Sequence, residues 1–285
     1  MARKTRQQIF ADYGIVSDKE GKHLYHPILG KLPLLIIDGN DKIGRRSKKW
    51  NTLGVWHFST LPTTATFKGV INGIELEEKG TCPCTCMDKD GKITCYATKG
   101  YYSMYGYDNL VWRTWLIRND LEFVKNALIA QIKADHIKLM RYHASGDFDS
   151  NEYIEMTKEV VKACPETTFW TYTKNIHAEH AFDEFENANI VKSFIPHFGF
   201  NYGHCDYILA LYAYLKEKGY SVYICRCGAY DDQHCNNCTA CSHNDYVLFL
   251  EHSTEYKAKE DPLFPQVKAI IDSQADQFLV KYKEH

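Results

Sequence analysis

The chain has 285 residues, of which 45% are hydrophobic, and a formal net charge of −2. A chain of this length buries enough apolar surface to fold without disulfides, and its near-neutral charge excludes the strong basic field of a dedicated nucleic-acid binder. Its longest aliphatic run, at 32–37, is far shorter than the roughly 20 residues that span a bilayer, and residues 1–14 lack the apolar stretch of a secretion signal. We therefore expect a cytoplasmic protein without membrane contact, whose eleven cysteines serve more readily as metal ligands than as disulfides.

Positive charge is concentrated at the N-terminus. Residues 1–50 contain eleven Lys or Arg and five Asp or Glu, and the basic run RRSKKW occupies 45–50. We predict a basic N-terminal segment over 1–50, a β/α domain with a C-terminal cysteine cluster over 51–252 and a helical extension over 253–285. A solvated arm is the simpler interpretation of the basic segment, and weak contact with phosphate or nucleic acid is the alternative.

Helices and strands alternate from residue 119 onward. Asp120 is placed to cap a first helix at 119–136, and Asp149 with Glu152 is spaced as a capping box for the next. Further helices are predicted at 150–164, 177–188 and 206–218, and strands at 137–148, 167–174, 190–200 and 220–225. This alternation predicts an α/β fold with a parallel β/α sheet, open or closed into a partial barrel, and with cysteine-rich loops that bind clusters.

Polar side chains gather at the ends of the predicted strands, where ligands bind in parallel α/β proteins. One strand end carries Arg141, His143, Ser145 and Asp147, and the next carries Lys174. Arg141 and His143 are two residues apart, so on a strand they should face the same side and could bind a carboxylate or phosphate. The simpler interpretation is a turn with a helix cap, in which Arg141 pairs with a nearby acid.

A C-x-x-C-x-x-C run near the C-terminus comprises Cys235, Cys238 and Cys241. Two successive two-residue spacings let one loop direct three thiolates at one inorganic centre, as in iron–sulfur proteins. Cys225 is the natural fourth ligand, since it ends the strand that leads into this loop. Zinc is the competing metal, because four thiolates also form a structural zinc site in which a nearby histidine could replace one of them.

A first group of cysteines is less regular: Cys82, Cys84, Cys86 and Cys95 lie within fourteen residues. On an extended backbone the first three share one face, so all of them could reach one metal, and a three-cysteine set is equally compatible with the spacing. Three ligands would leave one iron of a 4Fe-4S cluster open to a substrate or cofactor. A fully ligated structural centre is the alternative.

The order of these segments resembles the gene 88 protein family of phages and mobile elements over roughly residues 50–252. The most specific matches are CYA at 95–97, H-x-SGDF at 143–148 and YTK at 172–174, with RND between the first two. The resemblance implies that the family's N-terminal cysteine set is Cys82, Cys86 and Cys95, and its C-terminal set Cys225, Cys235, Cys238 and Cys241. It implies no particular reaction.

The plan is also distantly similar to that of radical SAM enzymes, which hold a 4Fe-4S cluster in a cysteine loop and S-adenosylmethionine at the end of the next strand. That likeness implies that Ser145, Gly146 and Asp147 bind the cofactor. From their positions at the strand ends, the candidate catalytic residues are Asp147, His143, Arg141 and Lys174. The CxxxCxxC spacing of those enzymes is absent.

Two hypotheses follow from these patterns. The first is a redox or radical-type enzyme with two iron–sulfur clusters, acting on a small-molecule or macromolecular substrate and served by a redox partner. The second is a zinc-stabilised module that binds nucleic acid or protein, in which the basic run at 45–50 and the aromatic residues at 101–107 would make contact.

Overall fold

The computed structural model describes residues 4–38, 54–85, 95–98, 107–195, 199–226, 238–250 and 257–278. Its main sheet has five strands in the order β10-β9-β8-β5-β4. These are β4 (Ile37–Asp38), β5 (Val55–Phe58), β8 (Leu139–Tyr142), β9 (Thr168–Thr173) and β10 (Ala188–Lys192). Four of them run parallel, and β4 pairs antiparallel with β5 at one edge. The predicted parallel sheet is confirmed, and in the described residues it is open rather than closed into a barrel.

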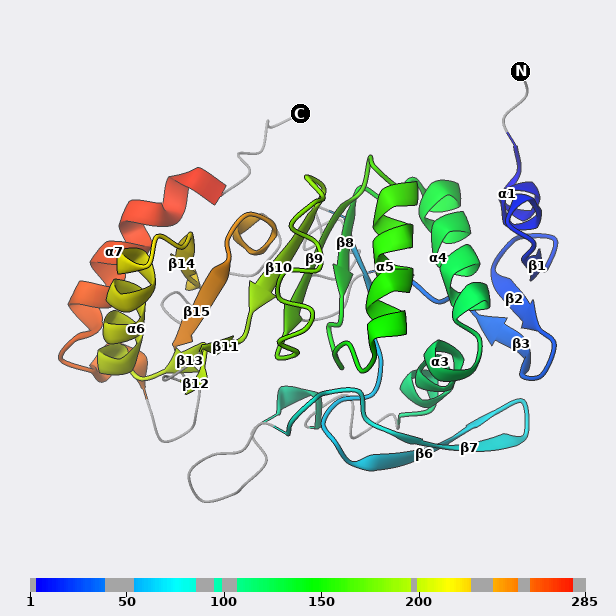
Figure 1. Ribbon diagram of the computed structural model, residues 1–285, viewed down its shortest axis with the longest axis horizontal. Helices are drawn as coiled ribbons and strands as arrows, with labels where there is room; N and C mark the ends of the chain where they lie inside the picture. Colours follow the sequence, from blue (N-terminus) through cyan, green and yellow to red (C-terminus); the bar gives the residue numbers. More distant parts are fainter. Residues whose placement is uncertain are drawn as a thin grey trace.

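Helices α4 (Leu121–Asp135) and α5 (Asn151–Ala163) lie along one face of this sheet, and α3 (Asp108–Asn119) packs against α4 below them (Figure 1). The helix predicted at 119–136 is confirmed, and the Asp120 side chain caps it by accepting from the Phe123 amide at 3.0 Å. The cap predicted for α5 was wrong. Ser150, not Asp149, accepts from the Tyr153 amide, because the Asp149 carboxylate pairs with Arg118 of α3 instead.

The N-terminal residues belong to the main core. Helix α1 (Arg6–Asp12) is followed by an antiparallel sheet of β1 (Val16–Ser17), β2 (His23–His26) and β3 (Gly30–Pro33). Phe10, Leu24 and Leu32 are fully buried in the same apolar cluster as Met140 of β8. Residues 4–38 are therefore not a solvated arm, because their apolar side chains complete this core. The basic run at 45–50 lies outside the described residues.

A hairpin of β6 (Thr66–Ile71) and β7 (Ile74–Lys79) packs against α3 and leads directly into the first cysteines (Figure 1). After β10, the short strands β11 (Phe194–Ile195) and β12 (Gly199–Phe200) lead into a second unit. The predicted helix at 177–188 is wrong, since 176–184 form turns before β10 begins at Ala188.

The second unit is a smaller parallel sheet with its own core. Its strands are β13 (Tyr202–Gly203), β15 (Tyr246–Leu250) and β14 (Val222–Ile224), in that order. Helices α6 (Cys205–Glu217) and α7 (Phe264–Phe278) pack on it (Figure 1), burying Ile208, Val267 and Ile271. The predicted helix at 206–218 is thus confirmed, and within residues 257–278 of the predicted extension the helical parts are η5 (Ala258–Glu260) and α7.

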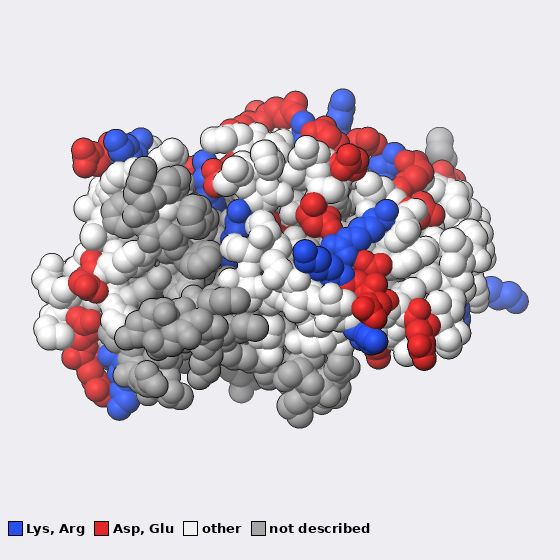
Figure 2. Space-filling model, turned by 60° about the horizontal axis from the view of Figure 1, so that its bottom comes forward, with Lys and Arg blue, Asp and Glu red and all other residues white. Residues whose placement is uncertain are grey.

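Charged side chains on the face shown in Figure 2 lie largely in groups of mixed sign. Ion pairs such as Lys125 with both Glu122 and Glu159 are typical of the described surface. Such groups neutralise one another instead of building a field of one sign. None of the helices in the described part of the chain is long and apolar enough to cross a bilayer.

Candidate functional site

The carboxyl edge of the main sheet is organised around Asp147, which is buried in the loop after β8. Its Oδ1 accepts hydrogen bonds from the Phe148 amide at 2.8 Å and the Thr173 hydroxyl at 2.7 Å. Its Oδ2 accepts from the Lys174 amide at 2.8 Å. Burial raises the pKa of Asp147, while Lys174 and these hydrogen bonds oppose the rise. Asp147 therefore fastens the β8 loop to the end of β9, as expected for adjacent strand ends.

Asp147 belongs to the S-G-D turn, formed by Ser145, Gly146 and Asp147, and the other two residues of this turn are in close contact with Thr60. Gly146 has φ +85°, and a Cβ there would lie 2.1 Å from Thr60 Oγ1 and 2.8 Å from Thr81 Oγ1. The Ser145 hydroxyl donates to the Thr60 carbonyl at 3.1 Å, and the Thr60 amide returns a bond to the Ser145 carbonyl at 3.0 Å. Glycine is needed here because the loop after β5 approaches so closely.

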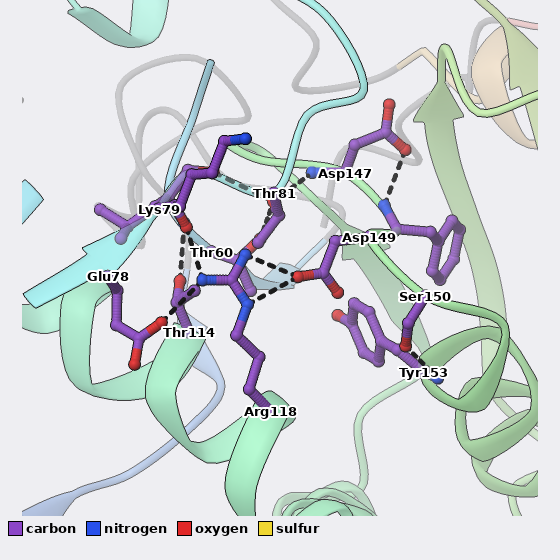
Figure 3. A network of polar contacts seen from close by, with 12 residues as sticks. Thr60, Glu78, Lys79, Thr81, Thr114, Arg118, Asp147, Asp149, Ser150 and Tyr153 are labelled. Carbon is purple, nitrogen blue, oxygen red and sulfur yellow. Dashed lines mark hydrogen bonds and ion pairs between the residues drawn. The ribbon is translucent and has the colours of Figure 1, made fainter. Parts of the chain in front are cut away.

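Cys82 is held at this same edge by a ladder of hydrogen bonds between residues 80–85 and the loop 59–65. The Cys82 amide donates to the Thr63 carbonyl at 3.2 Å, and the Thr81 amide to the Leu61 carbonyl at 3.0 Å. The Thr81 hydroxyl in turn accepts from the Asp147 amide at 2.9 Å (Figure 3). The first cysteine and the buried carboxylate are therefore joined through a single threonine.

The charged surroundings of Cys82 bring together three of the predicted site residues. Burial raises the pKa of the Cys82 thiol to about 12, the Lys174 ammonium opposes this rise, and Asp147 and Cys95 add to it. Cys95 begins the short turn that carries η1 (Tyr96–Thr98), where the Thr98 hydroxyl donates to the Cys95 carbonyl at 2.8 Å. Lys174, Asp147 and Cys95 are thus all near enough to Cys82 to affect the charge of its sulfur.

His143 and Arg141 do not share a site, contrary to the sequence-based expectation. Strand β8 ends at Tyr142, and His143 has φ +55°, so the simple alternation of strand side chains stops there. His143 Nδ1 lies 3.1 Å from Thr171 Oγ1, whereas the Arg141 guanidinium lies 4.9 Å from the ring centroid of Tyr172. Successive residues of β9 point to opposite faces, so the His143 ring and the Arg141 guanidinium lie on opposite sides of the sheet.

His143 is a buried, neutral histidine. Its second nitrogen, Nε2, lies 2.9 Å from Tyr153 Oη, and Phe148 packs edge-on against its ring with centroids 4.6 Å apart. Burial lowers the pKa of His143 to about 3, and Arg141 adds to the effect. Both ring nitrogens are engaged within the core, which gives His143 a structural role at this position.

The C-terminal cysteines form a second group on the far face of β9. Cys225 follows β14, Cys238 precedes the short helix η4 (Ala240–Ser242), and Cys241 lies within η4. All three pack in one apolar cluster together with Tyr172 and Tyr223. Burial and the neighbouring thiols raise the pKa of both tyrosines, so their hydroxyls stay protonated. The structure therefore brings Cys225, just after β14, together with Cys238 and Cys241 at η4.

Cys86 and Cys235 lie outside the described residues. Within the described ranges, no three His, Cys, Asp or Glu side chains are close enough together to hold a metal ion. Cys164 and Cys205 are buried in the two cores.

Arg118 is a residue whose role the sequence did not reveal. Its guanidinium donates to Glu78 at 2.7 Å and to the Lys79 carbonyl at 2.7 Å, both at the end of β7. It also pairs with Asp149 at 2.7 Å (Figure 3). Arg118 therefore ties the segment that carries Cys82 to the loop that carries Asp147. The RND segment is explained by this clamp together with the capping role of Asp120.

A family model described as gene product 88 matches residues 34–198. The match includes Cys82, Cys95, Asp147 and Lys174, and it ends before Cys225, so the resemblance expected as far as residue 252 is shown only in part. No curated protein and no solved structure matched the chain. The comparisons lend no support to the distant likeness to radical SAM enzymes. Because the matched residues make up more than half of its length, the chain belongs to the gene product 88 family.

Proposed function

We propose that the chain is an iron–sulfur redox protein with two cysteine-ligated centres, of which the N-terminal one is reactive. The observation that carries this proposal is the position of Cys82. It sits at the carboxyl edge of a parallel sheet, beside Asp147 and Lys174 and within electrostatic reach of Cys95. Ligands bind at this edge in open α/β sheets. The separate gathering of Cys225, Cys238 and Cys241 supports a second centre.

The donor set suits iron–sulfur ligation. Thiolates are soft ligands that favour iron–sulfur clusters or zinc over hard cations. Cys82, Cys86 and Cys95 would hold the N-terminal centre, and Cys225, Cys235, Cys238 and Cys241 the C-terminal one. A bound cluster supplies one-electron transfer, and a three-cysteine set leaves a position for substrate. The Lys174 ammonium favours the thiolate form of Cys82 that ligation requires.

S-adenosylmethionine does not fit the S-G-D turn. The Ser145 hydroxyl donates to Thr60, the space beside Gly146 is filled by Thr60, and both Asp147 oxygens accept bonds from the protein. These groups hold the loops together and are not presented to a ligand. The turn therefore offers that cofactor no binding site. Lys174, which is half-buried at the same edge, is the group that we propose for contact with an anionic substrate.

Anaerobic purification followed by iron, sulfide and zinc analysis tests the proposal. Two cubane clusters would give about eight irons per chain and a broad absorption band near about 400 nm. Cys82→Ser should remove the iron of the N-terminal centre, roughly half of the total. Cys164→Ser, at a buried thiol in the main core, should leave the iron content unchanged. Colourless protein with stoichiometric zinc would refute the redox proposal and favour the zinc-stabilised binding module.

A further inference from the structure

The tip of the β6–β7 hairpin is formed by Asn72 and Gly73, the one Asn-Gly pair in the sequence. Both residues have a positive φ, +52° for Asn72 and +80° for Gly73, as the two central residues of a type I′ turn require. This tip lies beside the turn that joins β2 to β3 (Figure 1). The tip is therefore a point of contact between the hairpin and the N-terminal sheet.

The side chain of Asn72 makes this contact. Its Nδ2 donates to the Leu29 carbonyl at 2.7 Å and to the Lys31 carbonyl at 2.6 Å. A side-chain amide has two N–H donors, so both of them are used here. Between the two carbonyls, a Cβ on Gly30 would lie 3.3 Å from Nδ2, so the amide is seated directly against the turn. Asn72 therefore links the hairpin to the N-terminal sheet through both N–H groups of its side chain.

The Asn72–Gly73 pair also has the composition that deamidates most readily, because no side chain shields the glycine nitrogen. In that reaction the Gly73 amide nitrogen loses its proton and attacks Cγ of Asn72. The new C–N bond replaces the bond to Nδ2, which leaves as ammonia, and water then opens the resulting succinimide to aspartate or isoaspartate. Asn72 is exposed, and a Cβ on Gly73 would meet no atom within 4 Å. The described surroundings therefore leave room for the ring to close.

We propose that Asn72 is a deamidation site, and that its conversion to aspartate or isoaspartate releases the tip of the hairpin from the N-terminal sheet. A carboxylate has no N–H to donate, and it would face the Leu29 and Lys31 carbonyl oxygens, which are also acceptors. Both hydrogen bonds are lost, and the new negative charge repels the carbonyl oxygens. The base of the hairpin stays in place, because Arg118 holds the end of β7. The reaction requires only water, so it is independent of the proposed metal centres.

Peptide mapping by mass spectrometry tests the reaction in the folded, full-length chain after incubation at mildly alkaline pH. We expect the mass gain of one deamidation, with an isoaspartate product, at Asn72 before any other described asparagine. Asn151 is exposed at the start of α5 and is followed by glutamate, so it is the internal control and should keep its amide. Gly73→Ala should slow the reaction at Asn72 several-fold, because the added methyl group hinders the attacking nitrogen. Deamidation of Asn72 no faster than that of Asn151 would overturn the assignment.

Hydrogen exchange of the full-length chain tests the release. Asn72→Asp reproduces the product and keeps a residue type that tolerates positive φ. It should speed amide exchange at 71–75 and 28–32 by at least about tenfold, because two hydrogen bonds are lost. Exchange at 78–82, beside Arg118, should stay as in the wild type. Asn151→Asp is the matched control, the same substitution at another exposed asparagine, and should exchange like the wild type throughout. Equal exchange at the hairpin tip in the two variants would refute the release.

Discussion

Replacing Gly146 with alanine tests whether the S-G-D turn is filled by the protein itself. Gly146 has φ +85°, a conformation that costs an L-residue about 1–2 kcal/mol. The new Cβ would also lie 2.1 Å from Thr60 Oγ1 and 2.9 Å from the Thr60 carbonyl. Overpacking of this kind costs about 1–3 kcal/mol. Together these terms predict a loss of about 2–5 kcal/mol in the free energy of unfolding.

Gly73→Ala is the matched control for the backbone term. Gly73 lies in the turn between β6 and β7 with φ +80°, and a Cβ there would meet no atom within 4 Å. We expect that variant to lose only the conformational part, about 1–2 kcal/mol. The difference between the two variants therefore measures the close approach of the β5 loop.

Urea unfolding followed by tryptophan fluorescence is the assay. All five tryptophans lie within residues 50–170, so the signal reports the unit that contains both glycines and not the C-terminal unit. Adding Thr60→Ala to Gly146→Ala removes the nearest clashing atom and should recover part of the loss in a double-mutant cycle. If Gly146→Ala lowers the free energy of unfolding by no more than Gly73→Ala does, the turn has room beside Gly146, and a cofactor could bind there.

The remaining predictions concern charge. Burial lowers the pKa of His143 to about 3, so near pH 5 the unfolded chain binds a proton at this histidine and the folded chain does not. The free energy of unfolding is therefore at its full value above about pH 6.5, the pKa of an unperturbed histidine. Below that pH it falls by about 1.4 kcal/mol per pH unit. Denaturation of His143→Gln between pH 5 and 7 should show a slope shallower by this one proton, and an unchanged slope would contradict the burial. Arg118→Met removes the partner of two half-buried acids and should cost about 2 kcal/mol, measured by urea unfolding. Lys68→Met, at an exposed pair with Glu77, should change stability by less than about 0.5 kcal/mol, and equal losses in the two variants would argue against the clamp.

The periodic parts of the fold were readable from the sequence. Helix α4 follows from its apolar spacing and its cap at Asp120, and the parallel order follows from alternation of strands and helices. The meeting of Asp147 with Lys174 also follows, because neighbouring parallel strands end at the same edge. Each of these predictions depends on local pattern or on a general rule of topology.

The failures come from contacts between residues far apart in the chain. Asp149 and Ser150 are both good caps, and the choice between them is made by Arg118, which lies 31 residues before Asp149. The prediction that Arg141 and His143 face the same side assumed that the strand continues through His143. The strand instead ends before His143, which has a positive φ that the residue type alone does not predict. Glycine at 146 suggested a ligand, but the close neighbour is Thr60, from the loop after a different strand.

Strand β9 lies between the two groups of cysteines, although the groups are far apart in the sequence. Because successive side chains alternate, Thr173 reaches the Asp147 loop beside Cys82, while Tyr172 reaches Cys241 on the other face. A slip of one residue in the pairing of β9 would exchange the faces and break both contacts at once. The burial of Phe169 in the main core opposes that slip. The order of residues in the YTK segment therefore has a physical reason: it places the contact with the Asp147 loop and the contact with Cys241 on opposite faces of the sheet.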